Sequence, residues 1–230
     1  MKLWTRIVTA LVSLLFATAA TASNYTGFKE LKKGEWAILV MKMGKGSKMK
    51  EKLIYLGEAK IDGKPAYGVE IIIDNPQMRG FGGVSQIWMD KKSDEEIKMV
   101  MQQGPQLMCM SMNMAGMMQQ QEKPMTKTPE AYSPEKPALR FGTYTTPTGK
   151  KVHVAVYKSQ KGDLPDANAE GEIWVSSETP FGIVKMVSNG KTVMYLEDFG
   201  KGAKPRIPVS KAIQCQPMDF GQMMGGMGVR

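Results

Sequence analysis

Two groups of methionines, each beside a cysteine, are the residues of this chain with the clearest capacity for chemistry. Residues 108–118 hold six methionines and one cysteine, and the stretch after residue 214 repeats the combination. The candidate ligands are Met108, Met110, Met112, Met114, Met117 and Met118 in the first group and Met218, Met223, Met224 and Met227 in the second. Thioether sulfur is a soft ligand that suits Cu(I), and it binds without first losing a proton. The pattern is therefore consistent with a Cu(I) site.

The same methionines have two other interpretations. Methionine fills gaps in cores and coats apolar binding surfaces, so the first group could form a flap over an apolar cavity. Compositional drift is the third interpretation, because methionine is enriched along the whole chain, with 21 residues in 230. All three interpretations stay open, and the sequence requires no cofactor.

The N-terminus has the layout of a secretory signal peptide. Lys2 and Arg6 form a basic start, Ile7–Phe16 is mostly apolar, and Ala20–Ala22 is an A-x-A cleavage site. We expect cleavage near Ala22 and a mature protein that begins at Ser23. The predicted location is therefore the periplasm or the outside of the cell.

Cys109 and Cys215 are the only cysteines. An even number of cysteines in an exported chain predicts a disulfide. Their separation of 106 residues gives a loop whose closure would stabilise the folded state by at most about 4–5 kcal/mol, on a loop-entropy argument. The bridge would also join the two methionine groups into one patch. Any copper site would then depend on thioethers alone.

The sequence offers little for catalysis. Its one histidine, His153, lies between two valines of an expected strand, so a structural or surface role is expected. The sequence contains no nucleophile elbow, phosphate-binding loop or zinc-ligand spacing. The glycine-rich run Arg79–Gly83 lacks the strand–loop–helix context that a phosphate site requires. We expect no enzymatic activity.

The charge pattern argues against nucleic acid as a partner. The chain has 31 Lys and Arg against 22 Asp and Glu, a formal net charge of +9. The basic residues are dispersed among acidic ones, and the sequence has no Arg-rich helix or aromatic RNA-binding signature. A dispersed positive surface fits attraction to an anionic membrane surface, or it simply keeps the protein soluble.

Short strands make up most of the remaining chain. Ten segments show strand periodicity and are separated by turn residues at near-regular spacing. They are Glu35–Met43, Lys50–Ile61, Ala66–Ile73, Val84–Asp90, Glu96–Gln102, Phe141–Thr146, Lys151–Lys158, Glu172–Ser176, Ile183–Ser188 and Thr192–Phe199. Asn189-Gly190 is the strongest hairpin signal. The series predicts an all-β fold in which an antiparallel sheet curls into an incomplete barrel.

Two stretches do not fit the predicted sheet. Residues 103–139 form an insertion rich in Met, Gln and Pro, and residues 201–230 form a C-terminal tail rich in Gly and Met. Long segments of this kind are usually functional or without fixed structure. The predicted organisation is a signal peptide over 1–22, a single β domain over 23–200 that contains the insertion, and the tail.

Part of the chain resembles a known superfamily. Glu172–Met186 reads EIWVSSETPFGIVKM and is followed by a hairpin and by Leu196–Gly200, while Leu31–Trp36 opens the strand series. With the strands between them, these segments resemble uncharacterised exported bacterial proteins similar to the LolA/LolB lipoprotein-carrier superfamily. The resemblance covers about residues 28–102 and 141–200. It implies an incomplete barrel around an apolar cavity that accepts lipid or lipoprotein acyl chains.

Three aromatic residues are the candidates for lining such a cavity: Trp88, Trp174 and Phe181. A structural interpretation is simpler, because Pro180-Phe181-Gly182 is a turn whose aromatic ring can cover the core.

Together these observations predict a non-enzymatic periplasmic binding protein that holds a lipid or acylated ligand in an apolar cavity. Two alternatives remain. One is a periplasmic Cu(I)-binding protein that acts through the methionine and cysteine groups, and the other is a structural or interaction protein of the cell envelope.

Overall fold

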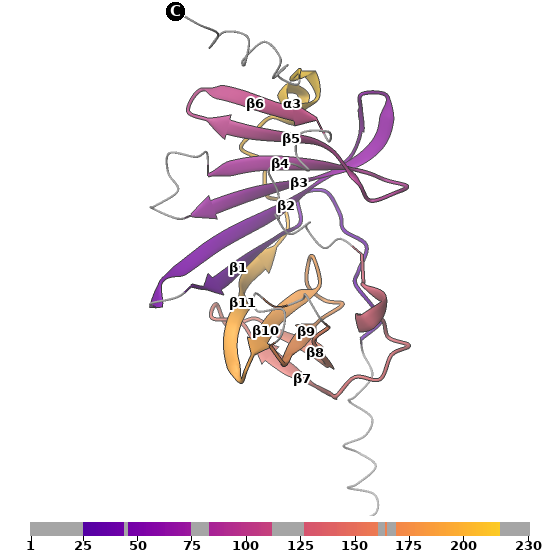
Figure 1. The fold of residues 1–230 in the computed structure, drawn as a ribbon, viewed down its shortest axis with the longest axis vertical. Coiled ribbons are helices and arrows are strands. Elements are labelled where there is room, and N and C mark those ends of the chain that lie inside the picture. Colours follow the sequence, from indigo (N-terminus) through magenta and orange to yellow (C-terminus); the bar gives the residue numbers. More distant parts are fainter. Residues whose placement is uncertain are drawn as a thin grey trace, which may run out of the picture. The chain divides into compact units, whose positions relative to one another are not determined.

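Strands dominate the computed structural model of the chain (Figure 1). It describes residues 25–43, 46–74, 83–111, 127–160, 164 and 169–216. The strands in these ranges are β1 (Trp36–Lys42), β2 (Lys48–Ile61), β3 (Lys64–Asp74), β4 (Val84–Asp90), β5 (Glu96–Gln103), β6 (Gln106–Ser111), β7 (Arg140–Thr145), β8 (Lys151–Lys158), β9 (Gly171–Val175), β10 (Ile183–Ser188) and β11 (Lys191–Gly200). The helical elements are a 3-10 turn, η3 (Glu130–Tyr132), and a short helix, α3 (Val209–Gln214).

The strands form one sheet with the order β6-β5-β4-β3-β2-β1-β11-β10-β9-β8-β7. From β1 to β6 and from β7 to β11, each strand pairs antiparallel with its neighbour in sequence. The prediction of an all-β protein with an antiparallel sheet is confirmed. All ten predicted strands are present, with bounds within two residues of the expected ones. The order ends at β6 and β7 and is not closed, and the predicted curling into an incomplete barrel stays a prediction.

Local sequence explains the tight hairpins of this sheet. Asp62 and Gly63 connect β2 to β3, and Asn189 and Gly190 connect β10 to β11. All four residues have positive φ values, between 48° and 81°. Two successive positive φ values match the right-handed twist of paired strands, and Asn, Asp and Gly are the residues that adopt them most readily. The expected Asn-Gly hairpin is therefore present.

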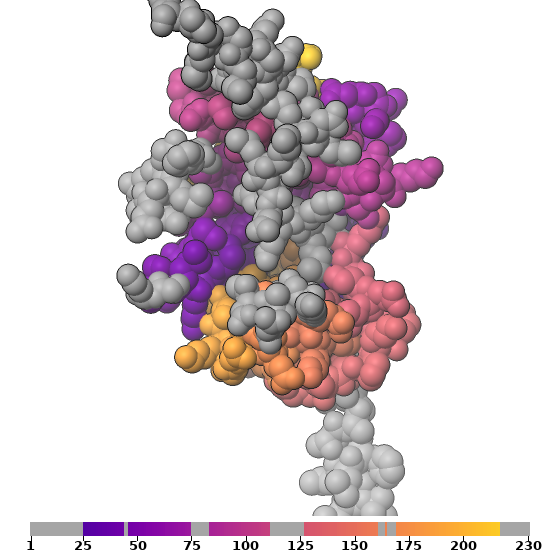
Figure 2. Space-filling model, in the orientation of Figure 1, coloured from indigo at the N-terminus to yellow at the C-terminus, as the bar shows by residue number. Residues whose placement is uncertain are grey.

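The described residues divide into two compact units, each with its own core. Unit 1 comprises residues from the ranges 1–29 and 125–195, and unit 2 comprises residues from 30–124 and 196–230. In the space-filling view, the salmon and orange segments of unit 1 pack against one another (Figure 2). Each unit is described separately below.

Three tyrosines organise the core of unit 1. The rings of Tyr25 and Tyr132 each meet the ring of Tyr157 edge-on, with centroids 6.1 and 5.8 Å apart. The Tyr25 hydroxyl donates a hydrogen bond to Tyr132 O (2.8 Å), and the Tyr157 hydroxyl donates one to Ser133 O (3.0 Å). These bonds satisfy buried polar groups and fix the first described residues against η3 and β8.

The core of unit 2 is built around Trp88 of β4. Its side chain is fully buried, and its ring lies over Gly68 of β3. A Cβ atom at Gly68 would lie 2.7 Å from the ring, so only glycine leaves room for the indole. Ile54, Leu56 and Val100 belong to the same buried core as Trp88.

Part of the predicted insertion belongs to the sheet, so the prediction that the insertion lies outside the sheet is wrong for these residues. Gln106–Ser111, within the predicted insertion, forms β6 and pairs with β5. In the predicted tail, Ile207 and Ala212 are buried in the core of unit 2. The reason is physical: methionine and cysteine look like low-complexity sequence in a composition count, yet they pack as apolar strand residues.

In the part of the chain that the structure describes, no helix has the length and apolar character needed to cross a membrane. The predicted signal peptide, 1–22, lies outside the described residues.

Candidate functional site

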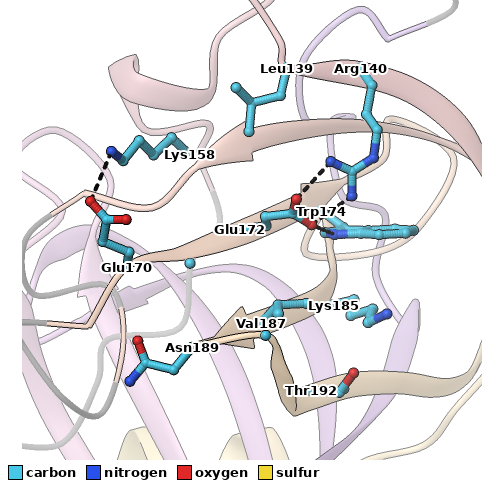
Figure 3. A pocket seen from close by; sticks show the side chains of 12 residues that line it. Leu139, Arg140, Lys158, Glu170, Glu172, Trp174, Lys185, Val187, Asn189 and Thr192 are labelled. Carbon is cyan, nitrogen blue, oxygen red and sulfur yellow. Dashed lines mark hydrogen bonds and ion pairs between the residues drawn. The ribbon is translucent and has the colours of Figure 1, made fainter.

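An open groove crosses the sheet of unit 1 from β7 to β11. It has a volume of about 690 Å³. Its lining includes side chains from the strand ends and from the β10–β11 turn, which Figure 3 labels. Those used below are Leu139, Arg140, Lys158, Glu172, Trp174 and Lys185. We call this feature the Trp174 groove.

Strand register brings two cations to the ring of Trp174. Arg140 pairs with Val156, Val156 pairs with Trp174, and Trp174 pairs with Lys185. The Lys185 Nζ atom lies 4.5 Å from the centroid of the indole ring, and the Arg140 guanidinium carbon lies 5.3 Å from it. Figure 3 shows the two cations on opposite sides of the ring. The ring is therefore held by cation–π contacts on both faces.

Glu172 of β9 completes this cluster. Its two carboxylate oxygens accept hydrogen bonds from Arg140 Nη1 (2.7 Å) and Nη2 (2.6 Å), and Oε2 also accepts one from Trp174 Nε1 (3.0 Å). The hydrogen bonds from Arg140 are the main reason that the pKa of Glu172 lies below its ordinary value. The same bonds raise the pKa of Arg140. Arg140 is therefore neutralised within the groove.

The remaining charges leave one cation available for a ligand. Lys158 Nζ lies 3.3 Å from Glu170 Oε1. Among the described residues, no carboxylate forms an ion pair with Lys185, which contacts the Trp174 ring and whose charge also helps to lower the pKa of Glu172. An apolar side chain lies next to these charges, because Leu139, which lines the groove, is 58% exposed. The groove can therefore bind a molecule with an anionic group and an apolar part.

The three predicted cavity residues have different surroundings in the structure. Trp174 lines the groove, whereas Phe181 is buried at the turn that leads into β10. Phe181 has a positive φ of 61°, as expected for a turn, and supports the structural interpretation of its ring. Trp88 lies in the core of unit 2. Their joint role in a ligand cavity stays a prediction.

The predicted metal ligands are described only in part. Met108 and Met110 lie on β6, where Met110 is buried. The other candidates lie outside the described residues: Met112, Met114, Met117, Met118, Met218, Met223, Met224 and Met227. Within the described ranges, no group of three or more His, Cys, Asp or Glu side chains could hold a metal ion. The thioether site stays a prediction.

The predicted disulfide is confirmed. Cys109 of β6 is bonded to Cys215, directly after α3, with their Cα atoms 6.1 Å apart. Both thiols are therefore consumed, and neither is available as a thiolate ligand. The bridge is typical of proteins that fold in an oxidising compartment outside the cytoplasm.

The single histidine lies on the surface of β8. His153 Nδ1 is 2.6 Å from Glu178 Oε1, and both side chains are exposed. Exposed pairs of this kind usually contribute little to stability. The expectation that His153 is not catalytic stays a prediction.

Sequence reasoning missed a set of buried polar residues in unit 2. Glu70 of β3, Gln86 of β4 and Lys98 of β5 are each at most 1% exposed. A signal for them exists in the sequence, since Glu70 interrupts an otherwise apolar strand between Val69 and Ile71. A charged residue at such a position needs a buried partner. That partner is far away in the sequence and is described below.

Comparisons with known proteins do not establish a family. No family model matches the chain, and no curated protein matches it. Among solved structures, one match is the crystal structure of a candidate lipoprotein from Parabacteroides distasonis. The match covers 77% of this chain and 100% of the other, with 11% sequence identity and a TM-score of 0.34. A likeness at this level carries no argument about function, and no named relative confirms the LolA/LolB resemblance.

Proposed function

We propose that this protein is an exported, non-enzymatic binding protein of the cell envelope that holds a lipid or acylated ligand. The observation that carries the proposal is the Trp174 groove, in which Lys185, which forms no ion pair with a carboxylate within the described residues, shares the lining with the exposed side chain of Leu139. The predicted signal peptide and the disulfide support a location outside the cytoplasm. The resemblance to the LolA/LolB superfamily implies the same ligand class.

The groove gives each part of such a ligand a place. An anionic head group would pair with Lys185, since Arg140 is already held by Glu172. The apolar part would lie along Leu139, whose exposed surface it would remove from water. Tryptophan beside cations and exposed aliphatic side chains is a combination common at membrane interfaces.

Native mass spectrometry of the mature chain, purified from the periplasm without detergent, is the first test. An adduct of lipid mass is the expected result. A second test titrates the protein with a monomeric anionic lysophospholipid, lysophosphatidylglycerol, and follows tryptophan fluorescence. We expect Lys185→Gln to weaken binding about tenfold, because a charge-assisted contact is lost.

The control is Lys60→Gln, which removes the same charge from an exposed position on β2 in unit 2. This variant should bind as tightly as the wild-type protein. The proposal fails if no lipid binds, or if Lys185→Gln and Lys60→Gln weaken binding equally. If zwitterionic lysophosphatidylcholine bound equally well, the proposed contact between Lys185 and an anionic head group would be excluded.

One observation favours Cu(I) binding as a second candidate function. The Cys109–Cys215 bridge joins the two chain positions from which the methionine groups extend, with Cα atoms 6.1 Å apart. Met112 follows Cys109 by three residues, and Met218 follows Cys215 by three. Covalent attachment at one point raises the effective concentration of one group near the other, which favours joint binding of one ion.

Substitution of the methionines in 108–118 by leucine tests this candidate, because leucine keeps the volume and removes the sulfur. We expect the variant to lose Cu(I) in competition with a chromophoric Cu(I) chelator. Met41→Leu and Met186→Leu, in strands β1 and β10, should retain it. Unchanged affinity in the 108–118 variant would exclude the candidate.

A further inference from the structure

A segment near the C-terminus crosses the sheet of unit 2 from one side to the other. It comprises residues 203–215, which we call the C-terminal strap. At its start, Ala203 N donates a hydrogen bond to Gly34 O (3.0 Å), next to β1. At its end, Cys215 is bonded to Cys109 of β6. Figure 1 shows this yellow segment running from β11 to α3.

The strap lies over the buried polar residues missed by sequence reasoning. Glu70 pairs with Gln86 in the register of β3 and β4, and Lys98 is the register partner of Trp88. Residues 86 and 88 share one face of β4, so these side chains form one group on that face. We call Glu70, Gln86 and Lys98 the polar row.

Each member of the polar row binds the backbone of the strap. The Glu70 carboxyl accepts hydrogen bonds from Arg206 N (2.7 Å) and Ile207 N (2.9 Å). Gln86 Nε2 donates to Ile207 O (2.7 Å) and to Glu70 Oε2 (2.9 Å).

The third member acts at the far end of the strap. Lys98 Nζ donates to Ile213 O, at 3.1 Å. All the contacts between the polar row and the strap therefore go to main-chain atoms. Such contacts recognise an extended or turned peptide by its backbone and leave its side chains largely unspecified.

The same face has hydrogen-bonding capacity that the strap does not use. Among the described residues, Gln86 Oε1 and Trp88 Nε1 are buried without a hydrogen-bond partner. One is an acceptor and the other a donor, which are the two groups that a peptide unit also offers. Buried polar atoms without partners destabilise a structure, so another peptide that reached them would bind this face well.

The disulfide holds the C-terminal end of the strap to β6. Both ends of the strap are held while the Cys109–Cys215 bond is intact. Cys215 is half-buried, whereas Cys109 is fully buried, so an attacking thiolate reaches Cys215 Sγ and expels the Cys109 thiolate. The second thiol of a dithiol donor then resolves the mixed disulfide. The donor becomes a disulfide, and the two cysteines gain two electrons and two protons.

We propose that the polar row is a peptide-binding site, that the strap is its resident occupant, and that thiol–disulfide exchange at Cys109–Cys215 determines whether this occupant can be replaced by another extended peptide. The site lies in unit 2 and is independent of lipid binding at the Trp174 groove. The partner is defined by its chemistry, as an unfolded or extended protein segment that offers backbone N–H and C=O groups.

Hydrogen exchange of the mature chain, with and without dithiothreitol, tests the release of the strap. We expect amides of residues 206–215 to exchange at least tenfold faster after reduction, because Arg206 and Ile207 donate the bonds that hold the strap to Glu70, and Ala212 and Cys215 donate bonds within the short helix of the strap. Strand β8 in unit 1 should be unchanged. Equal exchange in both states, or equal acceleration in all strands of unit 2, would overturn the proposal.

A labelled peptide of residues 202–216, with Cys215→Ser, tests the site itself by fluorescence anisotropy. It should bind the reduced chain and not the oxidised chain. Glu70→Gln should weaken peptide binding about tenfold, while Glu58→Gln, at an exposed position on β2, should leave it unchanged. A peptide that binds both redox states equally, or neither, would overturn the proposal. Lipid binding plays no part in either readout.

Discussion

The two units described above treat polar side chains in opposite ways. In unit 2, Glu70 and Lys98 are fully buried and bind backbone atoms of the strap. In unit 1, Arg140 and Glu172 are partly exposed and bind each other, and Arg140 and Lys185 contact the Trp174 ring. Buried polar groups cost several kcal/mol when a partner is lost, whereas exposed pairs are screened by water. The polar residues of unit 2 therefore hold the strap in one position, whereas those of unit 1 can exchange their contacts for a ligand.

Among the changes described below, removal of the disulfide should lower the free energy of unfolding most. We expect the double variant Cys109→Ala/Cys215→Ala to lower the free energy of unfolding by about 4 kcal/mol, because the bridge closes a loop of 106 residues. Urea denaturation followed by circular dichroism measures the change. Wild-type protein in dithiothreitol is the control and should match the variant. A loss below about 1 kcal/mol would mean that the strap is held by its other contacts alone.

Substitution of Glu70 should come next. Glu70→Ala leaves two backbone N–H groups and the Gln86 amide without their acceptor, and we expect a loss of about 3 kcal/mol. Glu172→Ala in unit 1 should cost less than about 1 kcal/mol. Equal losses in the free energy of unfolding of Glu70→Ala and Glu172→Ala would contradict the comparison between the units. Combined with the cysteine variant, Glu70→Ala should be non-additive, because both changes release the same strap.

Substitution of one glycine in each unit tests how tightly the two units are packed. Gly68→Ala places a Cβ atom 2.7 Å from the Trp88 ring, and we expect a loss of about 2 kcal/mol from overpacking. Gly142→Ala on the edge strand β7 meets only a Val154 methyl at 4.0 Å. This change should be neutral within about 0.5 kcal/mol. Thermal unfolding of both variants gives the result, and equal shifts in Tm would contradict it.

The smallest effect concerns pH. The hydrogen bonds from Arg140 hold the pKa of Glu172 below its ordinary value of 4.5. The stability that this provides is full above pH 4.5 and is lost as pH falls through the lowered folded pKa. Since the pair is partly exposed, we expect the contribution to be only a few tenths of a kcal/mol.

Urea midpoints at pH 7 and pH 3 measure this contribution in the wild-type protein and in Glu172→Gln. The variant should show the smaller difference between the two pH values. High salt should reduce the difference in the wild-type protein as well. An identical pH dependence in both proteins would show that the ion pair contributes nothing.

The strands were predictable because their signal is local. Alternation, β-branched residues and turns such as Asn189-Gly190 identified all ten predicted strands. The eleventh strand, β6, was missed because its Met-Cys-Met sequence looks like part of a biased segment. The strap was missed for a similar reason, since a composition rich in Gly and Pro hides Ile207 and Ala212, which are buried in the core of unit 2.

The candidate sites were less predictable because their partners are distant in sequence. Trp174 could be identified as an aromatic candidate, but its cation contacts depend on the register of three strands. Glu70 finds its partner 136 residues later, and that partner is a backbone amide. Every residue except proline has such an amide, so no side-chain pattern marks the one that is used.

The contacts of the strap also have a consequence for the order of folding. The chain is synthesised from its N-terminus, so residues 203–215 are made after every strand that they cross. Contacts so distant in sequence form late, because the intervening chain must first be placed. Until then Glu70, Gln86 and Lys98 remain hydrated on an incomplete face. The final folding step therefore dehydrates these three side chains, and a chain that ends before residue 203 never completes it.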